Sequence, residues 1–414
     1  MRDNAPLPPS VLVAELLDHL AAQTAEGDGA EAVKAARRRL LVEHPLQPFS
    51  PAAFAVDDTT DADPRVRSHH EGYAQALRRA AAAEPAPAEA PADARPNDED
   101  DDDAPDGPTL PFFTTPLAAP GAERRELTLT DLTRFFHNPC AALLQQRLGL
   151  QLPRREDELQ DDETFTADKL GAMALAERLL PALMAGADRD TALALAEAGT
   201  ELPSGSLGQP QREAEVERMQ GFAARLTALT ASPCVPPHLA RVEIDLDGER
   251  WSLQAAFADL RPAGLLRWRY ADTSPADRLA AWFAHLLLCA GAPAGVERQT
   301  IWLSRDGEFF FEPCDDPVGA LGGLLRLVCQ GLSEPLYFFP KSAWVFIDNG
   351  ESRSKARGKW HNSQEPAWGE DADPAYRLAL RGLPDPMDEA GFGRFGDCAR
   401  AVFGPLKAHL VDTR

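Results

Sequence analysis

The stretch from Leu239 to Cys289 constrains the fold of this chain more than any other segment. Its first half alternates apolar with charged residues, a period of two that is typical of a half-buried β-strand. Asp247-Gly248 follows, and Gly accepts the positive φ that a tight hairpin turn requires. The return strand alternates again, so we predict a β-hairpin. The apolar positions of the two strands are Val242, Ile244, Leu246, Trp251, Leu253, Ala255 and Phe257.

A third strand and a helix are predicted directly after this hairpin. The apolar run Leu265 to Tyr270 predicts the strand, and apolar residues at helical spacing between 279 and 287 predict the helix. Hairpin, strand and helix in this order resemble the core of restriction-endonuclease-like nucleases of the PD-(D/E)XK type. We therefore expect an α/β (α+β) fold of this kind.

Local signals predict further elements on both sides of this core. Thr128 with Asp131 is typical of a helix capping box, Asn138-Pro139 of a second helix start, and Gly149 of that helix's end. Other predicted elements are helices over 165–184, 213–229, 321–332 and 397–410, a hairpin over 300–311, and short apolar strands or buried segments at 336–339 and 344–347.

The charge balance limits how this chain could bind DNA. Acids outnumber bases by 65 to 42, which gives a net charge of −23. DNA affinity comes largely from Lys and Arg that neutralise phosphates. DNA contact is therefore confined to a local basic patch, or the main partner is another protein.

An Ala/Pro-rich acidic segment divides the chain. Residues 81–108 include six consecutive acids, Asp98 to Asp103. Such a composition cannot bury enough apolar surface to offset its ordering entropy, so we predict a disordered linker. An electrostatic shield over a basic channel, or DNA mimicry, is the alternative. The predicted division is 1–80, the linker 81–108, and a second domain over 109–414.

Several phrases, in a fixed order, carry a resemblance to a known family. They are LTLTDLTRFFHNPCAALLQQRLGL (127–150), GLLRWR (264–269), AWFAHLLLCA (281–290), IWLSRDGEFFF (301–311) and SKARGKW (354–360). Together they resemble the C-terminal region of RecC, the gamma chain of exodeoxyribonuclease V (the RecBCD enzyme). The N-terminal PPSVLVAELLDHL resembles the end of that family's helicase-like part, so 1–80 is expected to be its C-terminal remnant. Roughly the first two-thirds of a normal RecC is absent, so we assign Chi recognition to no residue.

The resemblance implies a non-catalytic part of a helicase–nuclease complex in recombinational double-strand-break repair. In that family the nuclease-like domain helps to part the duplex and docks RecD, while RecB cleaves DNA. The implied partners are RecB-like and RecD-like subunits and double-stranded DNA ends or single strands. We expect a cytoplasmic chain without a membrane span. We expect no cofactor, since the six cysteines lack zinc spacing and no P-loop sequence occurs.

In the register of the family, the positions of the nuclease active site lack its acids. The second-strand acid falls at Ala258, and the third-strand acid and lysine fall at Arg267 and Arg269. Asp259 is one residue off and should point away from the site, because strand side chains alternate faces. Asp272 lies too far along. We therefore predict no catalytic residue and no metal site, and we expect His285 to be a structural histidine.

The strongest candidate for DNA contact lies near the C-terminus. Arg353, Lys355, Arg357 and Lys359 alternate with other residues beside Trp360, a pattern that could grip phosphates and stack a base. The alternation would place all four cations on one side of an extended strand but would scatter them around a helix. A polar loop is the alternative. Two other functions stay open: an autonomous Mg²⁺-dependent nuclease, and a protein-interaction module without DNA contact.

Overall fold

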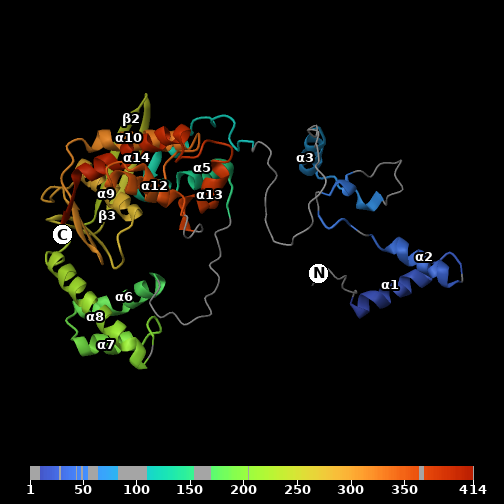
Figure 1. Cartoon of the computed structure of the whole chain (residues 1–414), viewed down its shortest axis with the longest axis horizontal. Helices are drawn as coiled ribbons and strands as arrows, with labels where there is room; N and C mark the ends of the chain where they lie inside the picture. The colour runs from blue at the N-terminus through green and yellow to red at the C-terminus, as the bar shows by residue number, and fades with distance from the viewer. Residues whose placement is uncertain are drawn as a thin grey trace, which may run out of the picture. The chain divides into compact units, whose positions relative to one another are not determined.

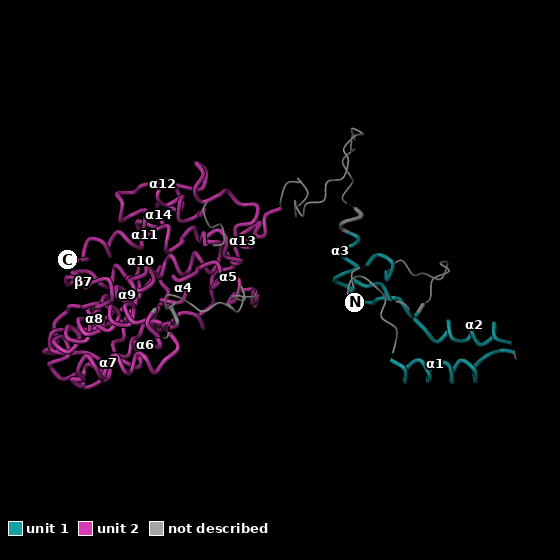
Figure 2. The backbone as a smooth tube through the Cα atoms, turned by 60° about the horizontal axis from the view of Figure 1, so that its bottom comes forward, with its two compact units in different colours: residues 1–103 teal, residues 104–414 magenta. Residues whose placement is uncertain are grey.

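A computed structural model of the chain describes residues 10–27, 29–42, 44–47, 50–54, 64–82, 110–152, 169–203, 205–362 and 368–413. The chain divides into two compact units, Met1–Asp103 (unit 1) and Ala104–Arg414 (unit 2) (Figure 2). Most of the acidic segment falls outside the described residues, as does the polar stretch 153–168.

Unit 1 contains helices and no described strand. They are α1 (Val11–Thr24), α2 (Ala30–Leu40) and α3 (Glu71–Ala82). Arg37 of α2 pairs with Asp18 of α1, and Arg39 pairs with Glu26 at 3.0 Å. Across the described part of both units, we find no helix with the length and apolar character that a membrane crossing needs.

Unit 2 combines two small sheets with a larger number of helices (Figure 1). Its elements in chain order are β1 (Glu126–Thr128), α4 (Leu129–His137), α5 (Pro139–Leu148), α6 (Lys169–Met184), α7 (Arg189–Glu197), α8 (Gly205–Leu229), β2 (His238–Leu246), β3 (Glu249–Phe257), β4 (Leu260–Arg261), β5 (Gly264–Arg269), α9 (Pro275–Gly291), β6 (Thr300–Ser304), β7 (Gly307–Phe311), α10 (Pro317–Gly331), α11 (Pro340–Asp348), α12 (Arg353–Trp360), α13 (Pro374–Ala379), α14 (Glu389–His409) and β8 (Leu410–Thr413).

The first sheet is built on the predicted hairpin, which the structure confirms. Its strand order is β1-β3-β2, with β1 parallel and β2 antiparallel to β3. Asp247 and Gly248 at the tip have φ angles of 55° and 85°, the two positive values that a type I′ turn needs. The apolar positions of both strands are buried in alternation, as the period of two predicts.

The second sheet has the order β4-β5-β6-β7-β8. β5 and β6 are parallel, and the helix α9 connects them. Parallel neighbours require such a crossover, whereas β6 and β7 form the second predicted hairpin. The third strand and the following helix of the predicted core are therefore confirmed as β5 and α9.

Helices cover the sheets on two faces. The central helix α9 is almost wholly buried, and it packs with α10 on the inner face of the β2–β3 hairpin. Gly291 permits this approach, since a Cβ there would lie only 3.1 Å from the Cβ of Ala240 on β2. A second apolar cluster joins α6 and α8 to the other face of β5 and β6 through Leu266, Tyr270 and Leu303.

The local capping signals are confirmed, and the segment 344–347 is helical. Thr128 and Asp131 form a reciprocal capping box at α4. Asn138 caps α5, and Gly149 ends it with φ 68°. The segment 344–347, predicted as a strand or a buried segment, lies in the helix α11 (Pro340–Asp348), in which Phe346 is buried. Pro340 favours a helix start there, because its fixed φ suits the first helical position.

Candidate nucleic-acid interface

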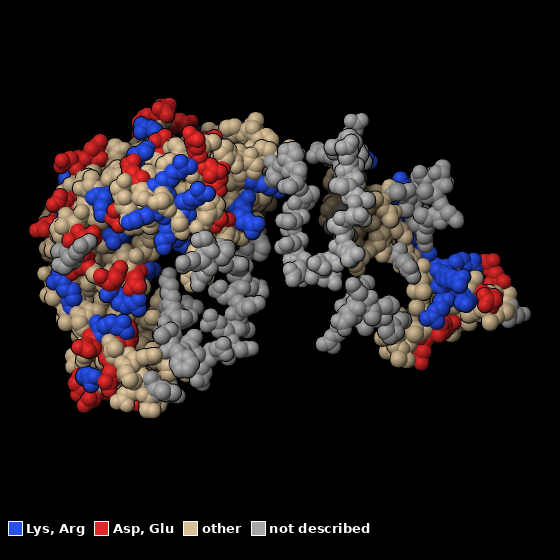
Figure 3. All heavy atoms as spheres, in the orientation of Figure 1, with Lys and Arg blue, Asp and Glu red and all other residues tan. Residues whose placement is uncertain are grey.

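The segment of four alternating cations is a helix, α12, and not an extended strand. Residues four apart lie on the same side of a helix. Arg353 and Arg357 therefore share one flank, and Lys355 and Lys359 share the other. All four side chains are exposed. Figure 3 shows Lys and Arg gathered on the face of unit 2 where Figure 1 places α12.

None of these four cations pairs with a carboxylate within the described part of the chain. Arg353 donates to the carbonyl oxygen of Met387 through Nε at 2.9 Å, and Lys355 donates to the side chain of Asn349. Acids that neighbour α12 are engaged elsewhere: Glu351 pairs with Arg400 at 3.0 Å. The positive charge of α12 is thus left uncompensated by described acids, in a protein that is acidic overall.

Trp360 lies under α12 and is not at its surface. Trp360 is only 3% exposed to solvent. The ring centroid lies 4.1 Å from that of Phe339 and 5.9 Å from that of Tyr376, and Nε1 donates to Asp385 at 3.4 Å. Trp360 and Ala356 form the buried stripe that attaches α12 to unit 2. A buried ring of this kind offers no open face to a base.

An exposed tryptophan that the sequence analysis missed lies near the end of α12. Trp368 is 74% exposed. The next residue, Gly369, packs so closely on the helix end that a Cβ there would lie 2.6 Å from the carbonyl oxygen of Trp360. Its signal in the sequence is the polar phrase HNSQEPAWGED, in which a lone Trp stands between turn-forming residues.

At the positions that the register of the family assigns to a nuclease site, the structure has an ion pair between two protein side chains. Asp259 follows the end of β3, and its Oδ2 accepts a hydrogen bond from Nη1 of Arg267 on β5. The prediction that Asp259 points away from this position is wrong. The alternation of strand side chains does not extend to Asp259, because β3 ends at Phe257 and the chain turns before β4.

The other charged residues of this region are also paired. Arg269 pairs with Asp277 in the first turn of α9. Asp272 accepts two hydrogen bonds from Arg305, at 2.9 and 2.8 Å. Among the residues described, no three His, Cys, Asp or Glu side chains lie close enough together to hold a metal ion. A hard divalent cation needs carboxylate oxygens as ligands. Here the carboxylates of Asp259, Asp277 and Asp272 are paired with the guanidinium groups of arginines.

His285 is a structural histidine, as predicted. It is fully buried on α9, where Nε2 lies 3.0 Å from the carbonyl oxygen of Glu312 and Nδ1 lies 3.1 Å from Oγ1 of Thr300. A carbonyl can only accept, so Nε2 carries the proton and Nδ1 accepts from the Thr300 hydroxyl. Burial lowers the pKa of His285 to about 4, so the ring is neutral at pH 7.

Glu370 is a buried acid that helps to hold the helices beneath the basic surface. Its carboxylate accepts hydrogen bonds from the backbone N–H groups of Lys341 and Ser342, at 2.9 and 2.7 Å, and from Oγ of Ser342 at 2.6 Å. These N–H groups lie in the first turn of α11, where a helix favours negative charge. Burial nevertheless raises the pKa of Glu370 above its usual value.

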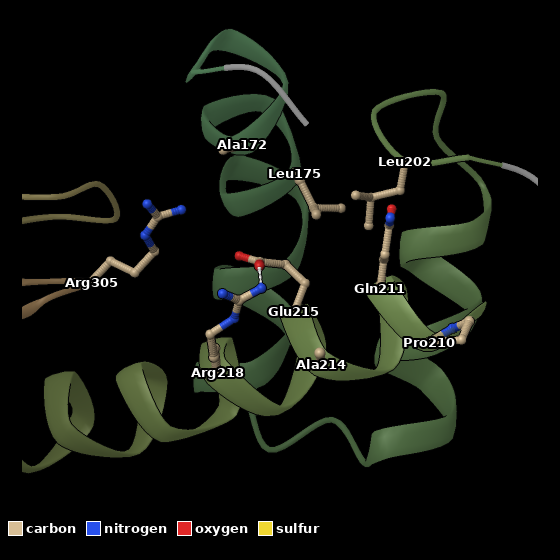
Figure 4. Close-up of a pocket in the computed structure, with 9 residues that line it drawn as sticks. All are labelled: Ala172, Leu175, Leu202, Pro210, Gln211, Ala214, Glu215, Arg218 and Arg305. Atoms are coloured by element: carbon tan, nitrogen blue, oxygen red, sulfur yellow. Dashed lines mark ion pairs between the residues drawn. The ribbon is translucent and has the colours of Figure 1, made fainter. Parts of the chain in front are cut away.

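A cavity of about 420 Å³ lies between α6, α8 and the turn that carries Arg305 (Figure 4). Most of its lining is apolar. Among the described residues that line it, the carboxylate is that of Glu215, which accepts from the hydroxyl of Tyr270 at 2.7 Å and pairs with Arg218. Both oxygens of Glu215 therefore contact side chains of the protein.

Comparison with known proteins shows the family. Residues 124–351, more than half of the chain, match the family described as RecC C-terminal domain. The chain is 28% identical over 411 residues to the RecBCD enzyme subunit RecC of Escherichia coli (strain K12), which covers 94% of this chain and 33% of that subunit. It is 27% identical over 391 residues to the RecBCD enzyme subunit RecC of Mycobacterium tuberculosis (strain CDC 1551 / Oshkosh), which covers 91% of this chain and 31% of that subunit.

The chain thus spans about a third of the length of these two relatives. Within the matched range lie both sheets apart from β8, the helix α9 and the Arg267–Asp259 pair. The resemblance expected from the sequence is confirmed: this chain belongs to the RecC C-terminal domain family.

Proposed function

We propose that this chain acts as a non-catalytic RecC-like part of a RecBCD-type helicase–nuclease complex in double-strand-break repair. The contact between Arg267 and Asp259 carries the proposal. It puts a fixed positive charge at the third-strand position where a nuclease of this type has an acid. A metal-binding carboxylate pair requires the opposite charge at that position.

The fold class supports the same assignment. We propose that β2, β3, β5, α9 and β6 correspond to the restriction-endonuclease-like core. Their order is a hairpin, a third strand, a helix and a parallel strand. We further propose the division into a helicase-derived remnant over 1–80, an acidic linker over 81–108 and a nuclease-like domain over 109–414.

DNA contact is assigned to α12. Its four cations lie at the surface, and the described acids around them are paired with other residues. Phosphate binding needs free positive charge more than any particular geometry. In this proposal, Arg357 and Lys359 contact phosphates first, because the described residues offer them no hydrogen-bond partner for their side chains. Arg353 and Lys355 contribute charge while they remain bonded to the protein.

Protein partners are assigned from the family and from the overall charge. The two relatives are named as RecC subunits of the RecBCD enzyme. We propose a RecB-like and a RecD-like subunit as partners of this chain, with cleavage carried out by the RecB-like subunit. A net charge of −23 suits a module that is docked on proteins better than an autonomous DNA binder.

The test is capture of the host's RecB and RecD by the tagged full chain, with a Mg²⁺-dependent nuclease assay on the chain alone. Capture without cleavage is the expected result. Cleavage that disappears in Asp259→Ala would overturn the proposal and support the autonomous nuclease. Capture without any DNA affinity, in the chain or in the complex, would support the protein-interaction module instead.

A further inference from the structure

We infer that Trp368 is a stacking platform for an unpaired nucleobase, and that the surface formed by α12 and Trp368 binds single-stranded nucleic acid. The inference rests on the proposed function, since it names the ligand class of the basic surface. It transfers the aromatic role that the sequence suggested for Trp360 to a different residue.

Two tryptophans near α12 have opposite surroundings. Trp360 is 3% exposed and packs on Phe339 and Tyr376, whereas Trp368 is 74% exposed. A large indole left in water is unfavourable, and the aromatic contacts found for other rings of unit 2 do not extend to Trp368 among the described residues. The exposed ring therefore has faces that a planar ligand can cover.

Trp368 precedes a residue that lies against the end of the helix α12. Gly369 lies against the last turn of α12, where a Cβ would meet the carbonyl oxygen of Trp360 at 2.6 Å and the backbone N of Asn362 at 3.0 Å. Because Trp368 is the preceding residue, its backbone lies beside the C-terminal end of α12. Lys359 is the last cation before that end. The backbone that carries the exposed Trp368 thus lies beside the end of the helix that carries the cations.

Single strands are the nucleic acid that such a surface fits. Cations that follow the backbone, combined with an aromatic side chain that stacks a base, are the common features of sequence-tolerant single-strand binding. A base within a duplex is already stacked and paired, so it cannot cover the indole without being unpaired. A duplex would use only the cations of α12.

The experiment compares Trp368→Ala and Trp368→Phe with the unaltered full chain. The probes are a labelled dT20 strand, a strand of the same length made of abasic deoxyribose phosphate, and a blunt duplex, all at fixed low salt. Trp368→Ala is expected to weaken dT20 binding by about fivefold or more. It should leave the abasic strand and the duplex unchanged, and Trp368→Phe should retain most of the dT20 affinity. Trp268→Phe, a partly exposed Trp on β5 that packs on Phe222, is the control.

Each other outcome is decisive. Unchanged dT20 affinity in Trp368→Ala, with affinity lost in Arg357→Ala/Lys359→Ala, would overturn the stacking inference and leave the proposed DNA contact intact. Equal losses on dT20 and on the abasic strand would also overturn it, because the base would play no part. Loss of RecB or RecD capture without any change on dT20 would identify Trp368 as a protein contact.

Discussion

Arg267 and Asp259 face each other across the turn that joins the two sheets, and each neutralises the charge of the other. Both side chains are partly exposed, at 32% and 38%. In the register that the resemblance implies, Arg267 stands at the third-strand position, for which no metal site is predicted. The carboxylate of Asp259 is thus bound by Arg267 of the same chain.

The first prediction concerns the strength of this pair. Arg267→Ala should lower the free energy of unfolding by about 1 kcal/mol or less, because water screens a partly exposed ion pair. A double-mutant cycle with Asp259→Ala, measured by urea unfolding, gives the coupling directly. A coupling of several kcal/mol would show that the pair is far more buried than the structure indicates.

The second prediction concerns the cations of α12 that have no described partner. Arg357→Ala/Lys359→Ala should weaken DNA binding and reduce the slope of log K against log salt by about 1 to 2, one counterion per lost phosphate contact. The measurement is fluorescence anisotropy over a salt series. Arg298→Ala/Arg326→Ala removes the same charge from exposed positions outside α12 and is the control. An equal effect of the control would mean that only net charge matters.

Arg353 should behave differently from its neighbours. It donates two hydrogen bonds to the carbonyl of Met387, and its guanidinium lies 4.8 Å from the ring centroid of Phe392. Arg353→Ala should therefore lower the free energy of unfolding by about 1 to 2 kcal/mol. Arg357→Ala should leave it nearly unchanged. Equal unfolding midpoints for the two variants would contradict this division between structural and ligand-binding cations.

A fourth prediction follows from the buried carboxylate of Glu370. In Glu370→Gln the amide nitrogen would face N–H donors of α11, so the variant should lose about 1 to 3 kcal/mol of stability. The exposed Glu217 on α8 offers a matched control, Glu217→Gln. Thermal unfolding of both variants tests this, and similar midpoints would show that the carboxylate is dispensable.

The fifth prediction is a pH dependence that originates in His285. Its pKa is about 4 in the folded protein, below the usual 6.5, because burial disfavours the charged ring. Between these values the unfolded chain binds a proton that the folded chain does not. The contribution of the neutral His285 ring to the free energy of unfolding is therefore complete above pH 6.5. It is lost as the pH falls toward 4, by an amount on the order of 3 kcal/mol.

The measurement compares the unfolding free energy of the unaltered chain with that of His285→Gln between pH 4 and pH 7. The variant is less stable throughout, but its curve should be flatter over this window. Parallel curves would show that His285 takes up no proton on unfolding. Carboxylates titrate in both proteins and cancel in the difference.

The elements set by short-range signals were predictable from the sequence. The reciprocal cap of Thr128 and Asp131 and the hairpin at Asp247-Gly248 depend on a few adjacent residues, and both are confirmed. The contact of Asp259 with Arg267 was not predictable, since it depends on where β3 ends and how the chain turns. Likewise, neither composition nor spacing distinguishes the buried Trp360 from the exposed Trp368; only the packing of α12 does.

The strand pairing also has a consequence for folding and aggregation. The five-stranded sheet is completed by β8 (Leu410–Thr413), which pairs with β7 (Gly307–Phe311) after a long series of helices. Closing so large a loop is slow, because its entropy cost comes before any contact is gained. Until β8 pairs with it, the aromatic strand β7 has an unpaired edge that other chains can bind. A shortened chain that stops before Leu410 would therefore self-associate through β7, even though it would keep the fully buried residues of the described core.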